Sequence, residues 1–331
     1  MKPPEPKYFS LYHSGELERR AKRLEERLAS CDICPQECGV NRLEDETKFC
    51  HSGRQPIVSS FCAHHGEEPV LSSSRGSGTI FFGNCNLRCL YCQNHQISQN
   101  WQGQKLNEID SRTLAQHMLY LQDALGCHNI NFVSPSHFVP QIVRAVLMAV
   151  PMGLKIPLVY NTNSYDSIKT LKELIGIISI YLPDLKYASD AWAKRLSQAP
   201  DYVRHSRCAI KEMFRQVGEL VVDELGVARR GVIVRHLILP NELAGSAESL
   251  AWLAKEVSPK VSLSLMSQYH PMHQALEFPP LSRTISPSEY KAALKIMNDA
   301  GLENGWRQGM GADKIYLPDF KSKGHPFAIK R

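Results

Sequence analysis

The sequence has no apolar run long enough to cross a membrane. Its longest apolar stretch, Leu174 to Leu182, is interrupted by Gly176 and Ser179 and falls well short of the roughly 18 residues that span a bilayer. The first 20 residues are rich in proline and charge and lack the apolar core of a signal peptide. We therefore expect a cytoplasmic protein with no membrane partner.

Strong net charge and repetition are also absent. The 39 Lys and Arg residues exceed the 33 Asp and Glu residues by only six, which is below the basic footprint of a dedicated nucleic-acid binder. Nucleic acid is therefore not indicated as a partner. With 43% hydrophobic and 22% charged residues, the composition is that of an ordinary globular protein. The 331 residues allow one large domain or two smaller ones.

Cysteine, in contrast, is abundant. The chain has ten cysteines, eight of them within the first 92 residues. A cytosolic protein of this size has no need of disulfides, because reducing conditions keep its thiols free. Metal binding is the natural explanation for this concentration of thiols.

Beyond the first cysteines, strand-like runs alternate with helical ones. This alternation predicts βαβ units and a parallel sheet, and the fold class that follows is α/β, a partial (β/α)6 TIM-like barrel with a Cys-rich N-terminal extension. The loop SSSRGSG separates a metal-binding extension, residues 1–75, from the barrel with its C-terminal helical segment, residues 76–331. The six expected strands cover residues 78–83, 129–133, 157–161, 177–182, 231–239 and 261–266.

Helices are expected from apolar residues at helical spacing. Such stripes cover residues 14–30, 114–125, 139–150 and 168–175, the last after a possible cap, Asp166. Ser286 and Glu289 form a capping box that predicts a further helix start.

The sharpest motif is Cys85-Asn-Leu-Arg-Cys89-Leu-Tyr-Cys92, directly after the first expected strand. Three soft thiolate ligands without a nearby fourth suit an iron–sulfur cluster in which one iron stays open. A structural zinc site would require four protein ligands.

This spacing, with an aromatic residue before the last cysteine, resembles the radical S-adenosylmethionine (SAM) superfamily. The stretch CLYCQN is similar to the pyruvate formate-lyase activating enzyme branch in particular. The resemblance implies a radical SAM oxidoreductase. Cys85, Cys89 and Cys92 would hold a [4Fe–4S] cluster that binds SAM and cleaves it reductively to a 5′-deoxyadenosyl radical.

The same resemblance implies further cofactor-binding residues. Thr162 and Asn163 look like the family's Thr-Asn pair, although Ser164 stands where the family has Gly, and ordinary turn chemistry is the alternative. Asp184 and Lys186 resemble an Asp-x-Lys pair at the methionine end of the cofactor, with a surface ion pair as the alternative.

Three other residues complete the expected SAM site. His270 follows the sixth strand and looks like the His of the family's Tyr-His pair, although a lone His is often structural. After the second strand the family has a Gly-Gly-Glu-type motif, and here Ser134 and Ser136 stand in its place. Their hydroxyls are expected to take over the hydrogen bonding to the cofactor. Of Arg235 and His236 on the fifth strand, only one can face the barrel interior.

A second cysteine group precedes the motif. Cys31, Cys34, Cys38 and Cys50 offer four thiolates with a short Cys-x2-Cys pair. Four cysteines can close a tetrahedral zinc site or hold a second iron–sulfur cluster. The sequence does not choose between these, and unligated thiols are a third alternative.

The resemblance implies a low-potential electron donor, flavodoxin or ferredoxin, and a protein substrate such as a glycyl radical enzyme. Radical modification of RNA or of a small metabolite is the first alternative. A non-catalytic zinc scaffold is the second, and it would require every cofactor-like match at a strand end to be accidental.

Overall fold

The strands form one curved sheet whose core is parallel. This computed structural model describes residues 6–315, 317–322 and 325–327. Within this part of the chain the sheet order is β1-β2-β3-β4-β5-β7-β8-β9. All neighbours from β2 to β9 are parallel, whereas β1 is antiparallel to β2 and the short β6 is antiparallel to β7. The strands are β1 Val58–His64, β2 Ser77–Phe82, β3 Ile130–Val133, β4 Leu158–Thr162, β5 Ile180–Pro183, β6 Val221–Val222, β7 Ala228–Leu237, β8 Ser262–Met266 and β9 Gly305–Arg307.

The six strands expected from the sequence are therefore confirmed as β2, β3, β4, β5, β7 and β8. Two strands that extend the sheet at its edges were not expected. β9 has three residues, two of them exposed, so it carries no apolar signal. β1 mixes buried and half-buried residues without regular alternation and lies before the expected domain boundary, yet it pairs with β2 along its length. The division at residue 75 stays a prediction.

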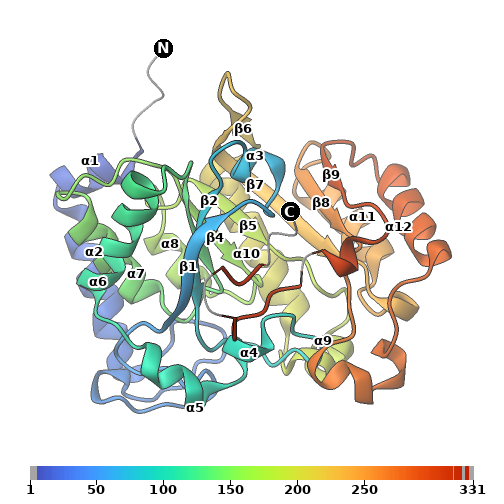
Figure 1. Cartoon of the computed structure of the whole chain (residues 1–331), viewed down its shortest axis with the longest axis horizontal. Coiled ribbons are helices and arrows are strands. Elements are labelled where there is room, and N and C mark those ends of the chain that lie inside the picture. Colours follow the sequence, from blue (N-terminus) through green and yellow to red (C-terminus); the bar gives the residue numbers. More distant parts are fainter. Residues whose placement is uncertain (1–5, 316, 323–324, 328–331) are drawn as a thin grey trace.

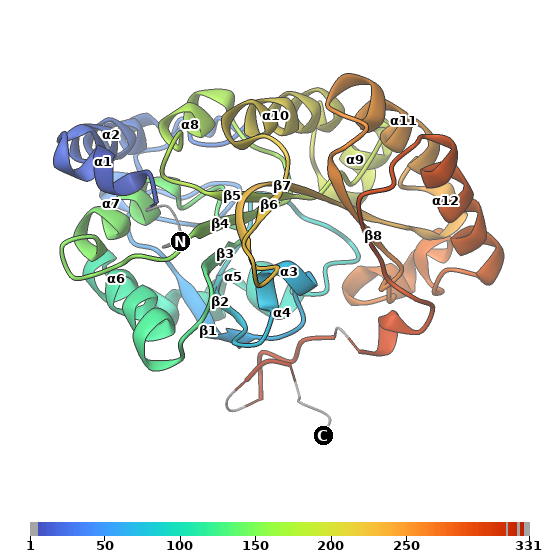
Figure 2. The ribbon, with the colours of Figure 1, turned by 90° about the horizontal axis from the view of Figure 1, so that it is seen from above.

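Helices cover the outer face of the sheet in an arc from α6 to α12 (Figures 1 and 2). The sheet does not close, because β1 and β9 stand at opposite ends of the strand order. The result is the expected partial barrel. The helices are α1 Tyr8–His13, α2 Glu16–Glu26, α3 Pro69–Ser72, α4 His95–Ser98, α5 Trp101–Gln104, α6 Ser111–Leu119, α7 Val139–Ala149, α8 Ile168–Glu173, α9 Asp190–Ser197, α10 Tyr202–Val217, α11 Ser246–Glu256 and α12 Pro287–Asp299.

Two details of the expected helices differ. The single helix expected over residues 14–30 is α2 alone, since Gly15 has a left-handed φ of 70° that separates α1 from α2, and residues 27–30 form a 3-10 turn. The possible cap Asp166 is wrong by one residue, because Ser167 is the residue that precedes α8. The capping box of Ser286 and Glu289 is present at α12.

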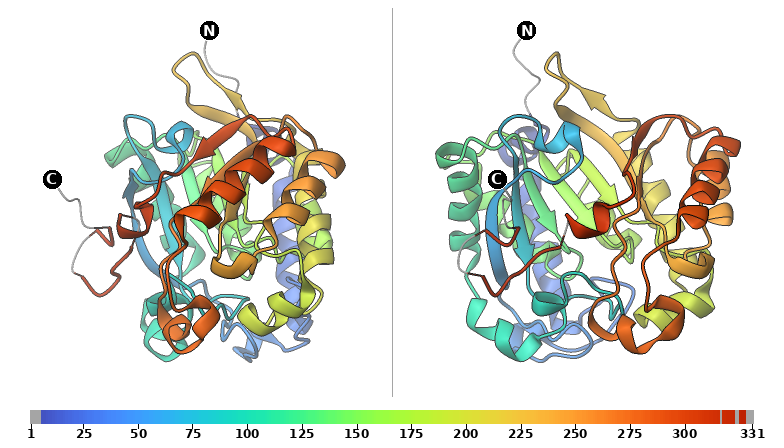
Figure 3. Two further views of the ribbon diagram at one scale, coloured as in Figure 1. Left: turned by 90° about the vertical axis from the view of Figure 1, so that its right-hand side faces the viewer. Right: turned by 45° about the vertical axis from the view of Figure 1, so that its right-hand side comes forward.

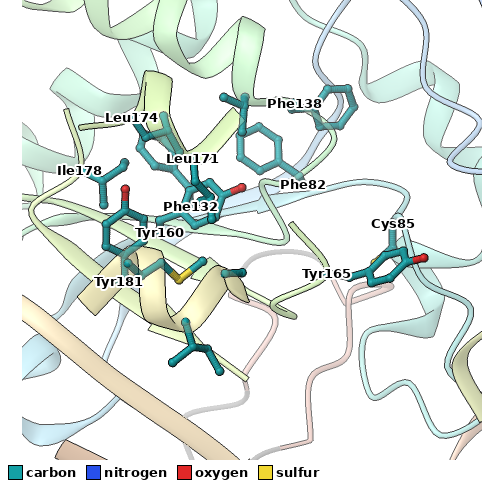
Figure 4. Packing of buried hydrophobic residues seen from close by; sticks show 14 of the residues in the cluster. Phe82, Cys85, Phe132, Phe138, Tyr160, Tyr165, Leu171, Leu174, Ile178 and Tyr181 are labelled. Atoms are coloured by element: carbon teal, nitrogen blue, oxygen red, sulfur yellow. The ribbon is translucent and has the colours of Figure 1, made fainter. Parts of the chain in front are cut away.

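The sheet has an apolar core on each face. Outside, Phe82, Phe132, Tyr160 and Tyr181 pack with the helices in one large cluster, which Figure 4 shows from close by. Inside, a smaller cluster fills one end of the barrel, with α3 supplying Leu71 against Val159, Ile180, Leu182, Ala228 and Ile233. Because α3 closes this end, the rest of the interior is left for polar residues near the carboxyl ends of the strands.

The C-terminal segment crosses the open side of the barrel (Figure 3). Phe320 packs on Phe81 with ring centroids 5.2 Å apart, and Phe327 stacks on His64 at 4.1 Å. In the described part of the chain, no helix is both long and apolar enough to cross a membrane.

Candidate functional site

A cavity of about 430 Å³ lies inside the barrel, where the parallel strands end. The carboxyl ends of barrel strands are where active sites collect. Residues from all the cofactor-like motifs except the one at His270 reach this cavity. Its lining includes Cys85, Cys89, Cys92, Ser134, Thr162, Asn163, Asp184 and Lys186.

The loop after β2 brings the three motif cysteines to this cavity. Each sulfur has a polar neighbour: the Leu87 amide donates to Cys85 Sγ at 3.4 Å, Ser197 Oγ donates to Cys89 Sγ at 3.0 Å, and Ser98 Oγ lies 3.1 Å from Cys92 Sγ. Hydrogen bonds of this kind stabilise and tune thiolates that bind iron. The chemistry of this donor set therefore fits a [4Fe–4S] cluster.

Burial opposes ionisation of the metal-free thiols. It raises the pKa of Cys85 to about 11 and of Cys92 to about 12, with repulsion from Cys89 as the next cause in each case. Among the described residues, no group of three or more His, Cys, Asp or Glu side chains stands ready to hold a metal ion. This applies to both cysteine groups.

Thr162 and Asn163 reach the cavity through a tight turn after β4. Thr162 Oγ1 donates to Asp166 Oδ2 at 2.6 Å, and Asn163 Nδ2 donates to Asn86 Oδ1 at 2.8 Å. Asp166 was expected as a helix cap. Its carboxylate instead fixes this turn, because it accepts hydrogen bonds from Thr162 and from the Tyr160 hydroxyl, the latter at 2.8 Å. Asn163 Nδ2 also lies 3.6 Å from Cys85 Sγ, so the turn and the cysteine loop are joined.

Asp184 and Lys186 form a buried ion pair in the cavity wall. Lys186 Nζ donates to Asp184 Oδ2 at 2.7 Å, and both side chains are less than a fifth exposed. Arg235 Nε donates to the other carboxylate oxygen, Asp184 Oδ1, at 3.0 Å. Burial by itself would raise the pKa of Asp184, but the charges of Lys186 and Arg235 together outweigh it and lower this pKa. The surface ion pair considered from the sequence is therefore not what the structure contains.

Arg235, rather than its neighbour, faces the interior. His236 points to the outer side, where its Nδ1 is 2.7 Å from the Leu185 carbonyl oxygen and its Nε2 is 2.9 Å from Ser246 Oγ. Besides Asp184, Arg235 contacts the Asn161 amide oxygen and lies 3.5 Å from Glu67 Oε2. Its side chain thus connects three elements of the barrel.

Two acidic residues before β2 complete this charged wall, and sequence reasoning missed both. Glu67 accepts from Asn131 Nδ2 at 3.1 Å, and the neighbouring Glu68 has one carboxylate oxygen without a hydrogen-bond partner. Burial raises the pKa of both carboxyls, although Arg235 acts against it. The sequence HHGEEPV does not indicate that Glu67 and Glu68 lie in the cavity wall, because their position depends on how α3 folds back into the barrel.

The remaining expected SAM residues differ in position. Ser134 lines the cavity, whereas Ser136 is buried behind it, with its Oγ 3.0 Å from Thr162 Oγ1. His270 is half-exposed, lies 3.8 Å from Asp313, and is not among the lining residues. Gln268, two residues earlier, does line the cavity and accepts from Gln308 Nε2 at 2.7 Å. The ligand roles of all these residues stay predictions.

The chain can be compared with known proteins on this basis. The family model described as "Radical SAM superfamily" matches residues 79–242, which include the cysteine motif, most of β2 and the strands from β3 to β7. The chain contains a radical SAM domain. The superfamily assignment implies a [4Fe–4S] cluster and SAM as cofactors, so the expected superfamily is confirmed and the activating-enzyme branch is left open.

The relatives of this chain are distant. An uncharacterized protein of Methanocaldococcus jannaschii is 28% identical over 278 residues, which cover 83% of this chain and 76% of that protein. A radical SAM methyltransferase from Sphaerobacter thermophilus has a similar structure, with a TM-score of 0.44, 12% identity, and coverage of 72% of this chain and 69% of that one. HydG, a maturase of the [FeFe]-hydrogenase, gives a TM-score of 0.48 at 11% identity, with coverage of 69% and 50%. The chain thus spans half the length of HydG.

Proposed function

We propose that the cavity binds SAM against an iron–sulfur cluster held by Cys85, Cys89 and Cys92, and that the enzyme abstracts hydrogen from a substrate there. One observation carries this proposal: the three motif cysteines and five of the seven expected SAM residues line the same cavity. When bound, the cluster supplies the electron that cleaves SAM to a 5′-deoxyadenosyl radical.

The protein's own contribution is to hold and orient the cofactor. Lys186 and Asp184 present opposite charges within 2.7 Å of each other, which suits the carboxylate and the amino group at the methionine end of SAM. Thr162 and Asn163 offer a hydroxyl and an amide to the ribose or the methionine. Ser134 is proposed to serve the amino group in place of a glycine-rich backbone segment.

Exclusion of water is a second contribution. Pro318 and Phe327 of the C-terminal segment line the cavity together with residues of the barrel. A reactive radical intermediate is protected from side reactions when its site is closed to solvent. This segment is therefore proposed as part of the enclosure in which hydrogen abstraction takes place.

The finer assignment concerns the hydrogen donor. We propose a protein substrate whose glycine backbone is oxidised to a radical, and reduced flavodoxin or ferredoxin as the electron source. What supports both is the similarity of CLYCQN to the activating-enzyme branch. A small metabolite or an RNA is the alternative substrate.

The decisive experiment measures 5′-deoxyadenosine formed by anaerobically reconstituted protein with SAM and a strong reductant. We expect product from the wild type and none from the Cys85, Cys89, Cys92 triple-Ala variant. A Cys208→Ala variant, which removes an exposed cysteine outside both groups, should behave as the wild type. No product from a protein with a loaded cluster would contradict the proposal.

The substrate class is tested with a deuterium-labelled hydrogen donor. Deuterium from a glycine-labelled protein partner should appear in 5′-deoxyadenosine if the activating-enzyme assignment is correct. Label transfer from a metabolite or RNA instead would contradict that assignment while leaving the SAM-cleavage proposal intact.

A further inference from the structure

The N-terminal cysteines come together in one buried loop next to the radical SAM motif. Cys31, Cys34 and Cys50 are each less than a tenth exposed, and Cys38 is half-buried. Electrostatic repulsion from each of the other three sulfurs adds to burial in raising the pKa of Cys34. The loop therefore gathers the four cysteines into one region of the structure, although they lie up to 19 positions apart in the sequence.

The backbone builds this loop around the thiols. The Cys31 amide donates to the Val40 carbonyl at 3.0 Å, and the Gly39 amide donates back to the Cys31 carbonyl at 3.0 Å. Gly39 has a φ of 69°, in the left-handed region that glycine favours. Backbone amides also point at the sulfurs, from Gln36 to Cys34 and from Phe49 to Cys38. Amide donors of this kind stabilise metal-bound thiolates.

A buried cation beside the loop supplies an independent observation. Arg42 is 1% exposed. Its guanidinium donates to the carbonyl oxygens of Gly53 at 2.9 Å and His137 at 2.7 Å, and its Nη1 is 3.9 Å from Cys31 Sγ. In the described part of the chain Arg42 forms no ion pair with a carboxylate.

This arrangement calls for a negative charge. A buried cation without a counter-charge is strongly unfavourable. His137 cannot supply one, because an imidazole is either neutral or positive, and burial, with Arg42 as the next cause, lowers the pKa of His137 to about 3 and keeps it neutral. The Cys31 sulfur, 3.9 Å from Arg42 Nη1, can supply it when it binds a metal, because a metal-bound cysteine is a thiolate.

We propose that Cys31, Cys34, Cys38 and Cys50 bind one thiophilic metal centre, and that Arg42 is its counter-charge. Four thiolates around Zn²⁺, or around a [4Fe–4S] cluster of charge +2, leave a net charge of −2 that Arg42 partly balances. Binding releases the protons of the four thiols. The sulfurs must turn inward to close on the metal, since no ready ligand set is present among the described residues.

The metal centre would also support the loop that carries Cys85, Cys89 and Cys92. Gln36, inside the cysteine loop, donates from Nε2 to the Asn86 carbonyl at 3.1 Å, and Arg88 donates to the Phe49 carbonyl. Asn86 and Arg88 both lie between the motif cysteines. The proposed centre therefore holds the backbone of the radical SAM motif in place from the outside.

The test isolates this site in the Cys85, Cys89, Cys92 triple-Ala background, purified anaerobically after growth with both zinc and iron. Metal analysis should find about one zinc per chain, or about four irons with matching labile sulfide. Either result supports the centre, and the two results identify the metal. Adding Cys34→Ser should remove this metal, whereas Cys127→Ser, a buried cysteine outside both groups, should not.

A Co²⁺ titration of the metal-stripped protein keeps the test informative if the Cys34 variant does not fold. Visible bands of tetrahedral cobalt thiolate are expected at about one equivalent. Arg42→Met, which keeps the side-chain length, should weaken metal retention against a chelator by roughly tenfold or more. No metal above the Cys34→Ser level and no cobalt bands would overturn the proposal. Because none of these readouts involves SAM cleavage, they are independent of the proposed function.

Discussion

Two serines near the cavity adopt the backbone conformation that glycine favours. Ser134 has a φ of 58° and Ser164 a φ of 64°, and a side chain in this region costs roughly 1–2 kcal/mol. Ser164 stands where the activating-enzyme family, by resemblance, has glycine. The turn after β4 thus keeps its glycine-type geometry even though the residue has changed.

Replacing Ser164 by Gly is therefore expected to stabilise the protein. The hydroxyl of Ser164 is buried without a hydrogen-bond partner, and removing such a group also removes a desolvation cost. Against the backbone entropy that glycine adds, we expect a net gain of about 1 kcal/mol in the free energy of unfolding, measured by denaturant titration. Ser164→Ala separates the two causes, because it removes the hydroxyl and keeps the strain. A destabilised glycine variant would contradict the strain argument.

The buried charges around Arg235 lead to a second prediction. Arg235→Met removes a positive charge that balances the buried carboxylates of Glu67 and Asp184. Breaking a buried ion pair in this way should lower the free energy of unfolding by about 3–5 kcal/mol. In the double variant with Glu67→Gln the loss should be smaller than the sum of the single losses, as a double-mutant cycle would show. Arg204→Met is the matched control, since its ion pair with Asp201 is exposed and should cost less than about 1 kcal/mol. Strict additivity would mean that Arg235 and Glu67 are not coupled.

At the residue scale, the spacing of residues and their position relative to strands predicted more of the candidate site than the identity of single side chains did. Cys85, Cys89 and Cys92 were predictable because three soft ligands in eight residues have few other uses. Asp184 and Lys186 were expected from the resemblance to an Asp-x-Lys pair, and their position after a strand supported this expectation. It was not predictable which of Arg235 and His236 faces inward, because the alternation of side chains along a strand shows only that the two point to opposite faces. The placement of Glu67 depends on tertiary folding of α3.

At the scale of elements, the C-terminal segment is anchored to α4 by one side chain. Gln96 Nε2 donates to Asp319 Oδ1 at 3.2 Å, and its Oε1 accepts from the Phe320 amide at 2.7 Å. His325 adds a contact to β1, with its Nε2 3.1 Å from the Ala63 carbonyl oxygen. Among the described residues of this segment, which covers the cavity, few polar contacts hold it in place, and local opening there should be easier than elsewhere.

Gln96→Ala is expected to loosen this segment without unfolding the barrel. Trypsin should cut at the exposed Lys321 several-fold faster than in the wild type, because local opening governs cleavage at such a site. The melting temperature should change little. Gln102→Ala, an exposed residue in α5, is the control. Equal cleavage rates in both variants would show that Gln96 does not anchor the segment.

The elements themselves were largely predictable from apolar patterning. The strands β2, β3, β4, β5, β7 and β8 all overlap the expected runs, because a parallel sheet buried on both faces reads as continuous hydrophobic sequence. β1 and β9 were missed because edge strands need no such run. The length of α2 was overestimated, because the apolar spacing continues over residues 14–30. This spacing does not reveal that Gly15 has a left-handed φ or that residues 27–30 form a 3-10 turn.

At the scale of the whole molecule, the open barrel keeps charge inside. Its interior holds Asp184, Lys186, Arg235 and Glu67 in one connected set, while the outer face packs apolar residues against the helices. Polar interiors of this kind depend on fixed protonation states. Stability should therefore depend on pH through the groups that burial holds neutral.

Three histidines held neutral by burial predict a loss of stability in acid. Burial lowers the pKa of His64 and His236 to about 4 and that of His137 to about 3, against about 6.5 in the unfolded chain. Below pH 6.5 the unfolded chain binds more protons than the folded one, so stability falls as the pH falls towards these folded-state values. Between pH 7 and pH 5 each histidine should cost about 2 kcal/mol.

Urea titrations at several pH values would measure this loss, using the Cys85, Cys89, Cys92 triple-Ala variant so that cluster loss does not contribute. His236→Gln should reduce the loss of stability between pH 6.5 and 5, because one buried group that titrates in this range in the unfolded chain is gone. His13→Gln, at an exposed position in α1, should leave the slope unchanged. Since water around these side chains would let them titrate near 6.5 in the folded chain, a flat profile would mean that the packing around the three histidines admits solvent.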